Sequence, residues 1–121
     1  MKKSGLGVDG ENLAADYLKS HGYKIIARNF ISRFGEIDIV ATYKNYLCFM
    51  EVKTRKSKRN IASGYESISL SKQRKIILTA NYFLITNRKY QNLQPRFDCI
   101  EVNIDDETGD VKIDMLISAF E

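Results

Sequence analysis

The sequence predicts an α/β fold in one domain, with elements in the order helix, three strands, helix and two strands. Two segments have apolar residues at helical spacing, and five short segments rich in β-branched and aromatic residues stand between turn signals. The chain has 121 residues, 44% of them apolar, with one proline, no repeats and no long linker. This composition indicates a single compact domain over residues 1–121.

The first half of the chain predicts a helix followed by a three-stranded meander. Val8–Ser20 has the apolar spacing of a helix, and His21-Gly22 supplies the stop signal. Lys44-Asn45 predicts a tight hairpin between the second and third strands. The three strand patterns are Tyr23–Phe30, Glu36–Tyr43 and Tyr46–Thr54.

The second half predicts a loop, a helix and a final pair of strands. Arg55–Tyr65 is polar, basic and contains glycine, so we expect a loop there. Ser71 then opens a helical pattern that ends near Asn87. The last two strands are predicted at Arg96–Ile104 and Val111–Leu116, with a turn at Asp105–Asp110.

The positive charge of the chain is clustered. Lys and Arg number 19 against 15 Asp and Glu, which gives a net charge of +4. Five of the seven residues 53–59 are basic, and Lys72, Arg74 and Lys75 follow, whereas acidic residues gather after residue 100. The cluster predicts a surface that meets phosphates, although such a run is also typical of a solvated loop.

Several classes of protein and site do not fit the sequence. The longest apolar run, Tyr46–Met50, is far short of the roughly 20 residues that span a bilayer, and no signal-peptide pattern is present. We therefore expect a cytoplasmic protein without membrane contact. Cys48, Cys99 and the single histidine, His21, lack the spacing of metal ligands. Gly5–Gly10 matches a dinucleotide fingerprint but follows no strand, so no small-molecule cofactor is expected.

Two carboxylates interrupt apolar strand patterns and need a physical reason, because an unpaired buried carboxylate is strongly disfavoured. Asp38 stands in one predicted strand and Glu51 in the next. Counting outward from the hairpin turn pairs Asp38 with Glu51, so the two side chains become cross-strand neighbours. Two carboxylates that close repel each other unless a cation lies between them.

A hard divalent cation such as Mg²⁺ suits this pair, because it takes oxygen ligands and needs only one or two carboxylates besides substrate phosphates. Asp38, Glu51 and the carbonyl of Val52 would supply the ligands. Lys53 shares a strand face with Glu51 and could orient or deprotonate an attacking water. These residues indicate phosphodiester hydrolysis. The alternative is that Glu51 and Lys53 form an ion pair on a solvated face, which contributes little to stability.

Six motifs spread along the chain resemble those of a known family. They are Gly7-x-x-Gly10-Glu11-x-x-Ala14-x-x-Tyr17-Leu18, Gly22-Tyr23, Arg28-Asn29-Phe30, Gly35-Glu36-Ile37-Asp38-Ile39-Val40, Glu51-Val52-Lys53-Thr54-Arg55 and Arg96-Phe97-Asp98. The chain thus resembles the YraN-like family of endonuclease-related bacterial proteins in the PD-(D/E)XK nuclease superfamily. That family is in turn similar to the archaeal Holliday junction resolvases. The resemblance covers nearly the whole chain.

The resemblance implies a restriction-endonuclease-like core, α-β-β-β-α-β with an additional C-terminal strand, in which helices flank a mixed central sheet. It implies Asp38 and Glu51 as ligands of Mg²⁺ or Mn²⁺, and Lys53 as the catalytic lysine. Glu11 matches an acidic residue that such nucleases bring to the same metal cluster. The alternative for Glu11 is an exposed glutamate that the helix dipole stabilises. Lys72 matches a position that contacts the active site or phosphate.

We therefore expect a metal-dependent endonuclease that acts on DNA. The similarity to resolvases points to branched or structured DNA and, by analogy, to a homodimer. The expected nucleic-acid contacts are Arg55, Lys56, Lys58, Arg59 and Lys72. The first alternative is a catalytically silent nucleic-acid-binding or adaptor protein that keeps the nuclease fold. The second is an interaction protein without a nucleic-acid partner.

Two further groups of side chains are left open. Glu36 shares a face with Asp38, but it could also begin its strand and pair with Arg33. Three aromatic residues of the second helix and its end could stack nucleobases, although their spacing favours the core for Phe83 and the surface for the tyrosines. These aromatic residues are Tyr82, Phe83 and Tyr90.

Overall fold

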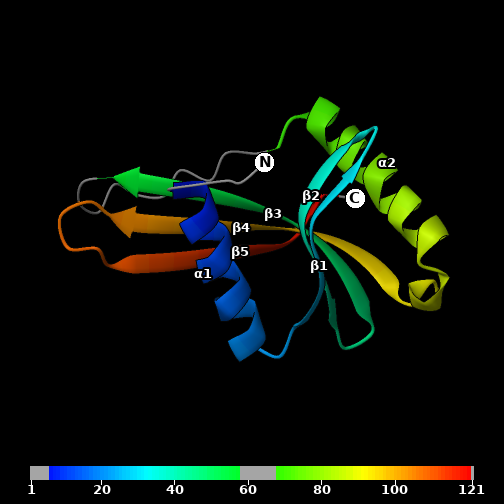
Figure 1. Cartoon of the computed structure of the whole chain (residues 1–121), viewed down its shortest axis with the longest axis horizontal. Coiled ribbons are helices and arrows are strands. Elements are labelled where there is room, and N and C mark those ends of the chain that lie inside the picture. The colour runs from blue at the N-terminus through cyan, green and yellow to red at the C-terminus, as the bar shows by residue number, and fades with distance from the viewer. Residues whose placement is uncertain (1–5, 58–67, 121) are drawn as a thin grey trace.

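The computed structural model describes residues 6–57 and 68–120, which form an α/β structure with two α-helices and five strands (Figure 1). The elements are α1 (Leu6–Ser20), β1 (Lys24–Ser32), β2 (Gly35–Tyr43), β3 (Tyr46–Ser57), α2 (Leu70–Thr86), the short 3-10 helix η1 (Arg88–Tyr90), β4 (Gln94–Asp105) and β5 (Val111–Phe120). The predicted order of helices and strands is confirmed.

One mixed sheet contains the five strands in the order β1-β2-β3-β4-β5. β3 and β4 run parallel, and every other neighbouring pair is antiparallel. A parallel pair needs a crossover connection, and α2 lies in the one between β3 and β4. The described residues therefore form the predicted restriction-endonuclease-like core, to which β5 adds the C-terminal strand.

The two helices cover opposite faces of the sheet, α1 beside β3 and β4 and α2 beside β1 and β2 (Figure 1). Leu18 of α1 is buried with Met50 of β3, whereas Ile76 and Phe83 of α2 are buried with Phe49 of β3. Since Phe49 and Met50 are adjacent, the alternation of β3 sends successive side chains into two separate clusters. Neither helix in the described part of the chain is long and apolar enough to cross a membrane.

α1 approaches β3 closely at Gly10. A Cβ atom at this position would overlap Oγ1 of Thr54, so only glycine fits without a shift of the strand or the helix. The helix ends just before Gly22, whose φ of 89° lies in the left-handed region. Both features belong to motifs that the sequence analysis singled out.

α2 begins with a side-chain cap that fixes its first turn. Oγ of Ser69 accepts a hydrogen bond from the backbone N–H of Lys72, at 3.2 Å. The helix spans Leu70–Thr86, one residue from the predicted limits at each end. The cap therefore fixes the first turn of α2, which carries Lys72.

The strands run further than the sequence predicts. β3 continues to Ser57, so Arg55 and Lys56 lie on a strand, and their assignment to the loop was wrong. Residues 58–65 of that loop lie outside the described residues. Parallel pairing with β4 continues to Ser57 and Asp105, and this partner satisfies the backbone of a segment whose polar side chains suggest a loop.

Candidate active site

β2 and β3 separate at the point where the two predicted acidic residues lie. Their antiparallel pairing extends from the hairpin turn to Ile39 and Met50, in the register that counting from the turn predicts. Beyond that pair, the backbone N–H of Val52 donates a hydrogen bond to Oδ2 of Asp38, at 2.8 Å. A carboxylate of β2 thus reaches the backbone of β3 where the two strands part.

The backbone of Val52 is directed toward the same opening. In a strand, the N–H and C=O of one residue point to the same neighbouring strand, and the N–H of Val52 points to Asp38. We therefore expect the carbonyl oxygen of Val52 on the side of the Asp38 carboxylate. Val52 directly follows Glu51, so one acidic side chain and one carbonyl occupy two consecutive positions of β3, beside the Asp38 carboxylate of β2.

Glu51 is largely but not fully buried on the α2 face of β3, and one of its two carboxylate oxygens has a partner. Oε1 lies 2.5 Å from Nζ of Lys72, and only 11% of the Glu51 side chain is exposed. Among the described residues, the buried Oε2 accepts no hydrogen bond. A buried carboxylate oxygen without a donor is costly, so this atom is suited to a ligand that brings positive charge.

Two lysines belong to the same region. Lys72 of α2 approaches Glu51 with a side chain that is 52% exposed, so it is open to solvent at its outer side. Lys53 follows Glu51 on the same face of β3 by alternation, and its backbone pairs with Glu101 of β4. The region therefore combines two acidic side chains from β2 and β3 with two amines.

Glu11 of α1 is buried and faces β1. It is 6% exposed, which contradicts the alternative of an exposed helix-start glutamate, and its Oε1 lies 4.0 Å from Nη2 of Arg28 on β1. α1 carries it on the sheet face opposite to Glu51. Within residues 6–57 and 68–120, no three His, Cys, Asp or Glu side chains are placed to hold one metal ion. The structure thus places the carboxylate of Asp38 on the backbone of Val52, the residue after Glu51, while Glu11 approaches Arg28.

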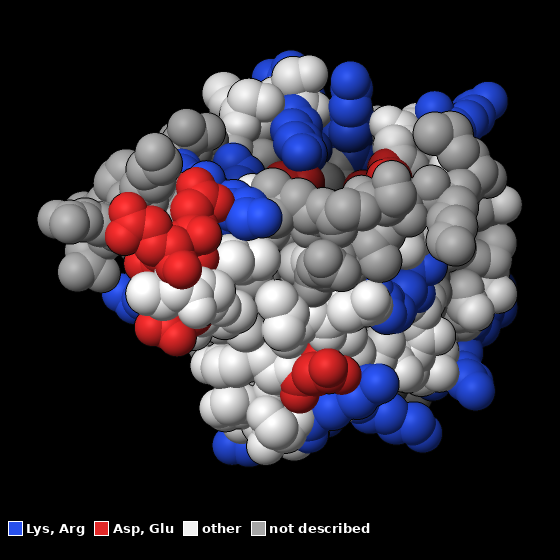
Figure 2. Space-filling view, turned by 60° about the vertical axis from the view of Figure 1, so that its left-hand side comes forward, with Lys and Arg blue, Asp and Glu red and all other residues white. Residues whose placement is uncertain are grey.

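The residues expected to contact nucleic acid differ in their surroundings. Arg55 lies 3.5 Å from Glu101, a carboxylate that is almost fully buried, so part of its charge is compensated within the sheet. Lys56 is exposed near the end of β3. Lys58 and Arg59 lie outside the described residues. Figure 2 shows acidic side chains recessed among projecting Lys and Arg side chains at the upper edge of one face.

Comparison with known proteins places this chain in a family. The profile of the uncharacterised protein family UPF0102 matches residues 10–102, which is most of the chain. The chain belongs to UPF0102. This membership confirms the resemblance to YraN-like proteins that the sequence motifs indicate.

Relatives of this UPF0102 protein match over nearly their whole length. The UPF0102 protein of Caldanaerobacter subterraneus subsp. tengcongensis is 40% identical over 121 residues, which cover 99% of this chain and 98% of the relative. That of Caldicellulosiruptor saccharolyticus is 39% identical, with 99% and 100% covered. That of Lachnoclostridium phytofermentans is 45% identical, with 83% and 84% covered.

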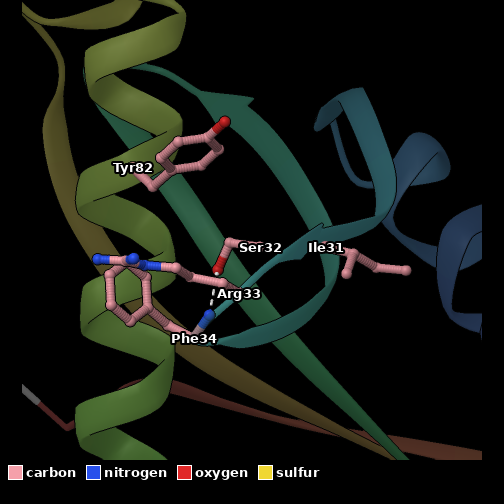
Figure 3. Close-up of a pocket in the computed structure, with 5 residues that line it drawn as sticks. All are labelled: Ile31, Ser32, Arg33, Phe34 and Tyr82. Carbon is pink, nitrogen blue, oxygen red and sulfur yellow. Dashed lines mark hydrogen bonds between the residues drawn. The ribbon is translucent and has the colours of Figure 1, made fainter.

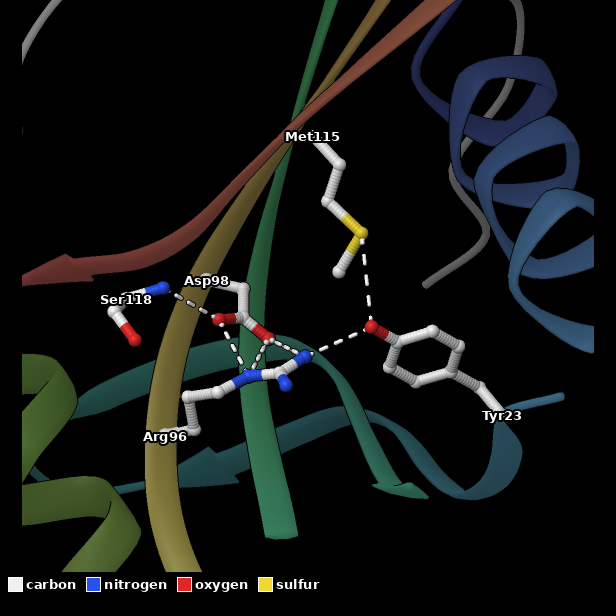
Figure 4. A network of polar contacts seen from close by, with 5 residues as sticks. All are labelled: Tyr23, Arg96, Asp98, Met115 and Ser118. Carbon is white, nitrogen blue, oxygen red and sulfur yellow. Dashed lines mark hydrogen bonds and ion pairs between the residues drawn. The ribbon is translucent and has the colours of Figure 1, made fainter. Parts of the chain in front are cut away.

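A buried network in this UPF0102 chain escaped the sequence analysis. Nε of Arg96 donates to both carboxylate oxygens of Asp98 at 3.0 Å, and Nη2 donates to the hydroxyl of Tyr23 at 2.8 Å (Figure 4). The backbone N–H of Ser118 donates to Oδ1 of Asp98, at 2.9 Å. The network therefore ties β4 to β5 and to the start of β1, on the sheet face that α1 covers, whereas Lys72 contacts Glu51 on the other face.

The surroundings of this network change three pKa values. Burial disfavours the charge of Arg96, but hydrogen bonds to Asp98 and Tyr23 outweigh it and raise the pKa of the guanidinium. Burial raises the pKa of Tyr23, and the hydrogen bond from Arg96 opposes that change. Burial, together with the charge of Asp98, raises the pKa of the Cys48 thiol to about 12. The network is thus charged and compensated inside a protein core.

The structure also shows the positions of the side chains for which the sequence left two interpretations. Phe83 is 3% exposed and Tyr82 is 44% exposed, which confirms the core and surface predicted for them. The guanidinium of Arg33 lies 4.9 Å from the ring centre of Phe34. Glu36 is exposed, and within the described residues no ion pair joins it to Arg33.

Proposed function

We propose that the protein hydrolyses phosphodiester bonds in DNA, with Mg²⁺ or Mn²⁺ as cofactor. The observation that carries the proposal is the buried Oε2 of Glu51, which has no hydrogen-bond donor among the described residues. Glu51 directly precedes Val52, whose backbone N–H contacts Asp38. Hard oxygen donors from two carboxylates and a carbonyl are the ligands that Mg²⁺ takes in proteins. The donor set therefore fits the cation.

Asp38 and Glu51 would hold the cation, together with the carbonyl of Val52. When bound, such a cation supplies Lewis-acid polarisation of a phosphoryl oxygen and lowers the pKa of water. The chain itself supplies orientation: the hydrogen bond from Val52 fixes the rotamer of Asp38, and the sheet fixes Glu51 beside it. The Nζ of Lys53 would hold the attacking water in line or offset charge on the phosphoryl oxygens.

The positive charge of α2 supports DNA as the substrate. α2 contains Lys72, Arg74 and Lys75 and no acidic residue, and its first turn is next to Glu51. A cationic helix beside recessed carboxylates would bind the phosphates that flank the scissile bond. Branched or structured DNA, cut by a homodimer, is the narrower form of the proposal, because two cuts on a symmetric junction suit two-fold symmetry.

One observation favours a second candidate, a nucleic-acid-binding or adaptor protein without turnover. Lys72 already neutralises Glu51 through the contact at Oε1. If this ion pair persists with DNA bound, Glu51 has less negative charge to offer a cation. The two candidates differ in one respect only, which is strand cleavage.

A cleavage screen tests the proposal. Linear, single-stranded, flapped and four-way DNA are incubated with the protein and Mg²⁺ or Mn²⁺, beside Glu51→Ala. We expect the wild-type protein to cut at least one of these substrates. Glu51→Ala, shown to be folded by circular dichroism, should cut none. Salt-sensitive DNA binding without any metal-dependent cleavage would favour the silent protein.

A further inference from the structure

We infer that the pocket between the β1–β2 turn and α2 receives an unstacked nucleobase of the DNA strand whose backbone lies at Glu51. The inference rests on the proposed function for the identity of the ligand as nucleic acid. It adds a substrate class, namely DNA with at least one unpaired nucleotide near the reacting phosphate. The residues that carry it are Tyr82, Arg33 and Phe34.

Planar groups line the pocket on two sides. It has a volume of about 340 Å³ and is lined by Ile31, Ser32, Arg33, Phe34 and Tyr82. Figure 3 shows the ring of Tyr82 on one side and the guanidinium of Arg33 laid over Phe34 on the other, with Ser32 between them and Ile31 pointing away. Planar groups in the wall of this pocket favour a planar ligand, and a nucleobase is planar.

One stripe of α2 connects this pocket to the candidate active site. Lys72 contacts Glu51, and ten residues later Tyr82 reaches the pocket, a distance of about 15 Å along the helix. Between them, Lys75 and Thr79 lie against the β1–β2 turn, since a Cβ on Gly35 would be 3.4 Å from Cβ of Lys75. These positions follow helical i, i+3 and i+4 spacing, so they share one side of α2. Thr79 is fully buried under the turn, so a strand of a few nucleotides would reach the pocket over the exposed side chains of Lys75 and Arg33.

The charge along the line suits a nucleic-acid backbone. Lys72, Lys75 and Arg33 are all positive, and α2 has no acidic side chain. Tyr82 is 44% exposed, so its ring has free surface for stacking. A cationic track with an aromatic stacking site at its end is the pattern of single-strand recognition, whereas a duplex keeps its bases stacked inside.

Base identity should matter little in this pocket. The hydroxyl of Ser32 already contacts the backbone N–H of Phe34 at 3.1 Å and Oγ1 of Thr79 at 3.0 Å. Ser32 therefore holds the shape of the turn and has little capacity left to read base edges. Stacking on Tyr82 and Arg33 accepts any base, because every base has a π-face.

The test uses a short single-stranded oligonucleotide with 2-aminopurine at its centre and a duplex of the same length, both in EDTA so that no strand is cut. We expect Tyr82→Ala to bind the single strand roughly fivefold or more weakly than wild type, and the duplex equally. Tyr82→Phe should retain wild-type affinity and the change in 2-aminopurine fluorescence. Leu116→Ala is the matched control, because Leu116 is an apolar side chain on β5 with a similar exposure of 41%.

Equal single-strand affinity of Tyr82→Ala and wild type would overturn the inference, and so would a wild-type protein that does not bind the single strand. Cleavage of DNA is scored separately with Mg²⁺. If wild type cuts DNA but Tyr82→Ala leaves the single-strand affinity unchanged, the inference about the pocket is wrong and the proposed hydrolysis stands. Binding that depends on Tyr82 without any cleavage supports the pocket and defeats the proposed hydrolysis.

Discussion

The carboxylate of Asp38 on β2 accepts a hydrogen bond from the backbone of Val52 on β3, at 2.8 Å, just beyond the last paired residues of the two strands. This contact has two consequences. It fixes the side chain of Asp38 next to Glu51, and it turns the backbone of Val52 toward the gap between the strands. The geometry of the candidate active site follows from where a hairpin stops pairing.

Asp38→Asn should separate the charge of this residue from its structural role. The amide oxygen of asparagine can still accept the hydrogen bond from Val52, so the midpoint of thermal unfolding should change little. Loss of the negative charge should lower the rate of metal-dependent cleavage by roughly 100-fold or more. Asp38→Ala should lose both the activity and about 1–3 kcal/mol of stability. A fully active Asp38→Asn would exclude Asp38 as a ligand.

Lys72→Ala should reduce the salt dependence of DNA binding. If Lys72 contacts one phosphate of a duplex, the slope of log affinity against log salt should fall in magnitude by about 0.9. Fluorescence anisotropy over a series of salt concentrations measures this slope. Lys89→Ala serves as the control, because Lys89 lies beyond the end of α2, over the ring of Tyr90 at 5.2 Å. The same slope for Lys72→Ala and Lys89→Ala would mean that Lys72 meets no phosphate.

Asp98→Ala should destabilise the fold without involving the candidate active site. Removal of this carboxylate leaves the charge of Arg96 buried without its partner, which costs about 3–5 kcal/mol. Urea unfolding at neutral pH gives the free energy of unfolding. For comparison, Lys112→Ala removes a 74% exposed side chain that lies 4.0 Å from Asp114, and its effect should be within about 0.5 kcal/mol. Similar losses in both variants would contradict the buried network.

Cys48 should make the protein less stable at alkaline pH. The thiol loses its proton near pH 9.0 in the unfolded chain, but its pKa is about 12 in the folded protein. Between these values the folded state binds one more proton, so stability is fully present below pH 9.0 and falls by about 1.4 kcal/mol per pH unit as pH rises. Urea unfolding at several pH values should show a shallower fall for Cys48→Ala than for wild type. If the free energy of unfolding fell equally with pH in both proteins, the titration of Cys48 would not contribute to the alkaline loss of stability.

The order of the elements could be predicted because local signals mark each of them. The stop at Gly22, the hairpin at Lys44-Asn45 and the helical pattern after Ser71 all act over a few residues. The end of β3 could not be predicted in this way. Arg55 and Lys56 have the side chains of loop residues, and only their parallel partners Asn103 and Ile104 of β4, far along the chain, keep them extended.

The approach of Asp38 to β3 could be predicted because it depends on the hairpin register, although the paired residues end at Ile39 and Met50, before Asp38 and Glu51. The surroundings of Glu11 could not, since its contact with Arg28 depends on how α1 lies across β1. The burial of Asp98 and Glu101 was not predicted, although both interrupt an apolar strand as Asp38 and Glu51 do. The rule that a buried carboxylate needs a partner would have found both.

The rate of single-turnover DNA cleavage by wild type and Glu51→Gln, measured across Mg²⁺ concentrations, tests the central claim most directly. The control is Glu107→Gln, which changes an exposed residue in the turn between β4 and β5. We expect a metal-dependent rate for wild type and the control, and a rate at least roughly 100-fold lower for folded Glu51→Gln at every concentration. Cleavage by Glu51→Gln at the wild-type rate would contradict the account.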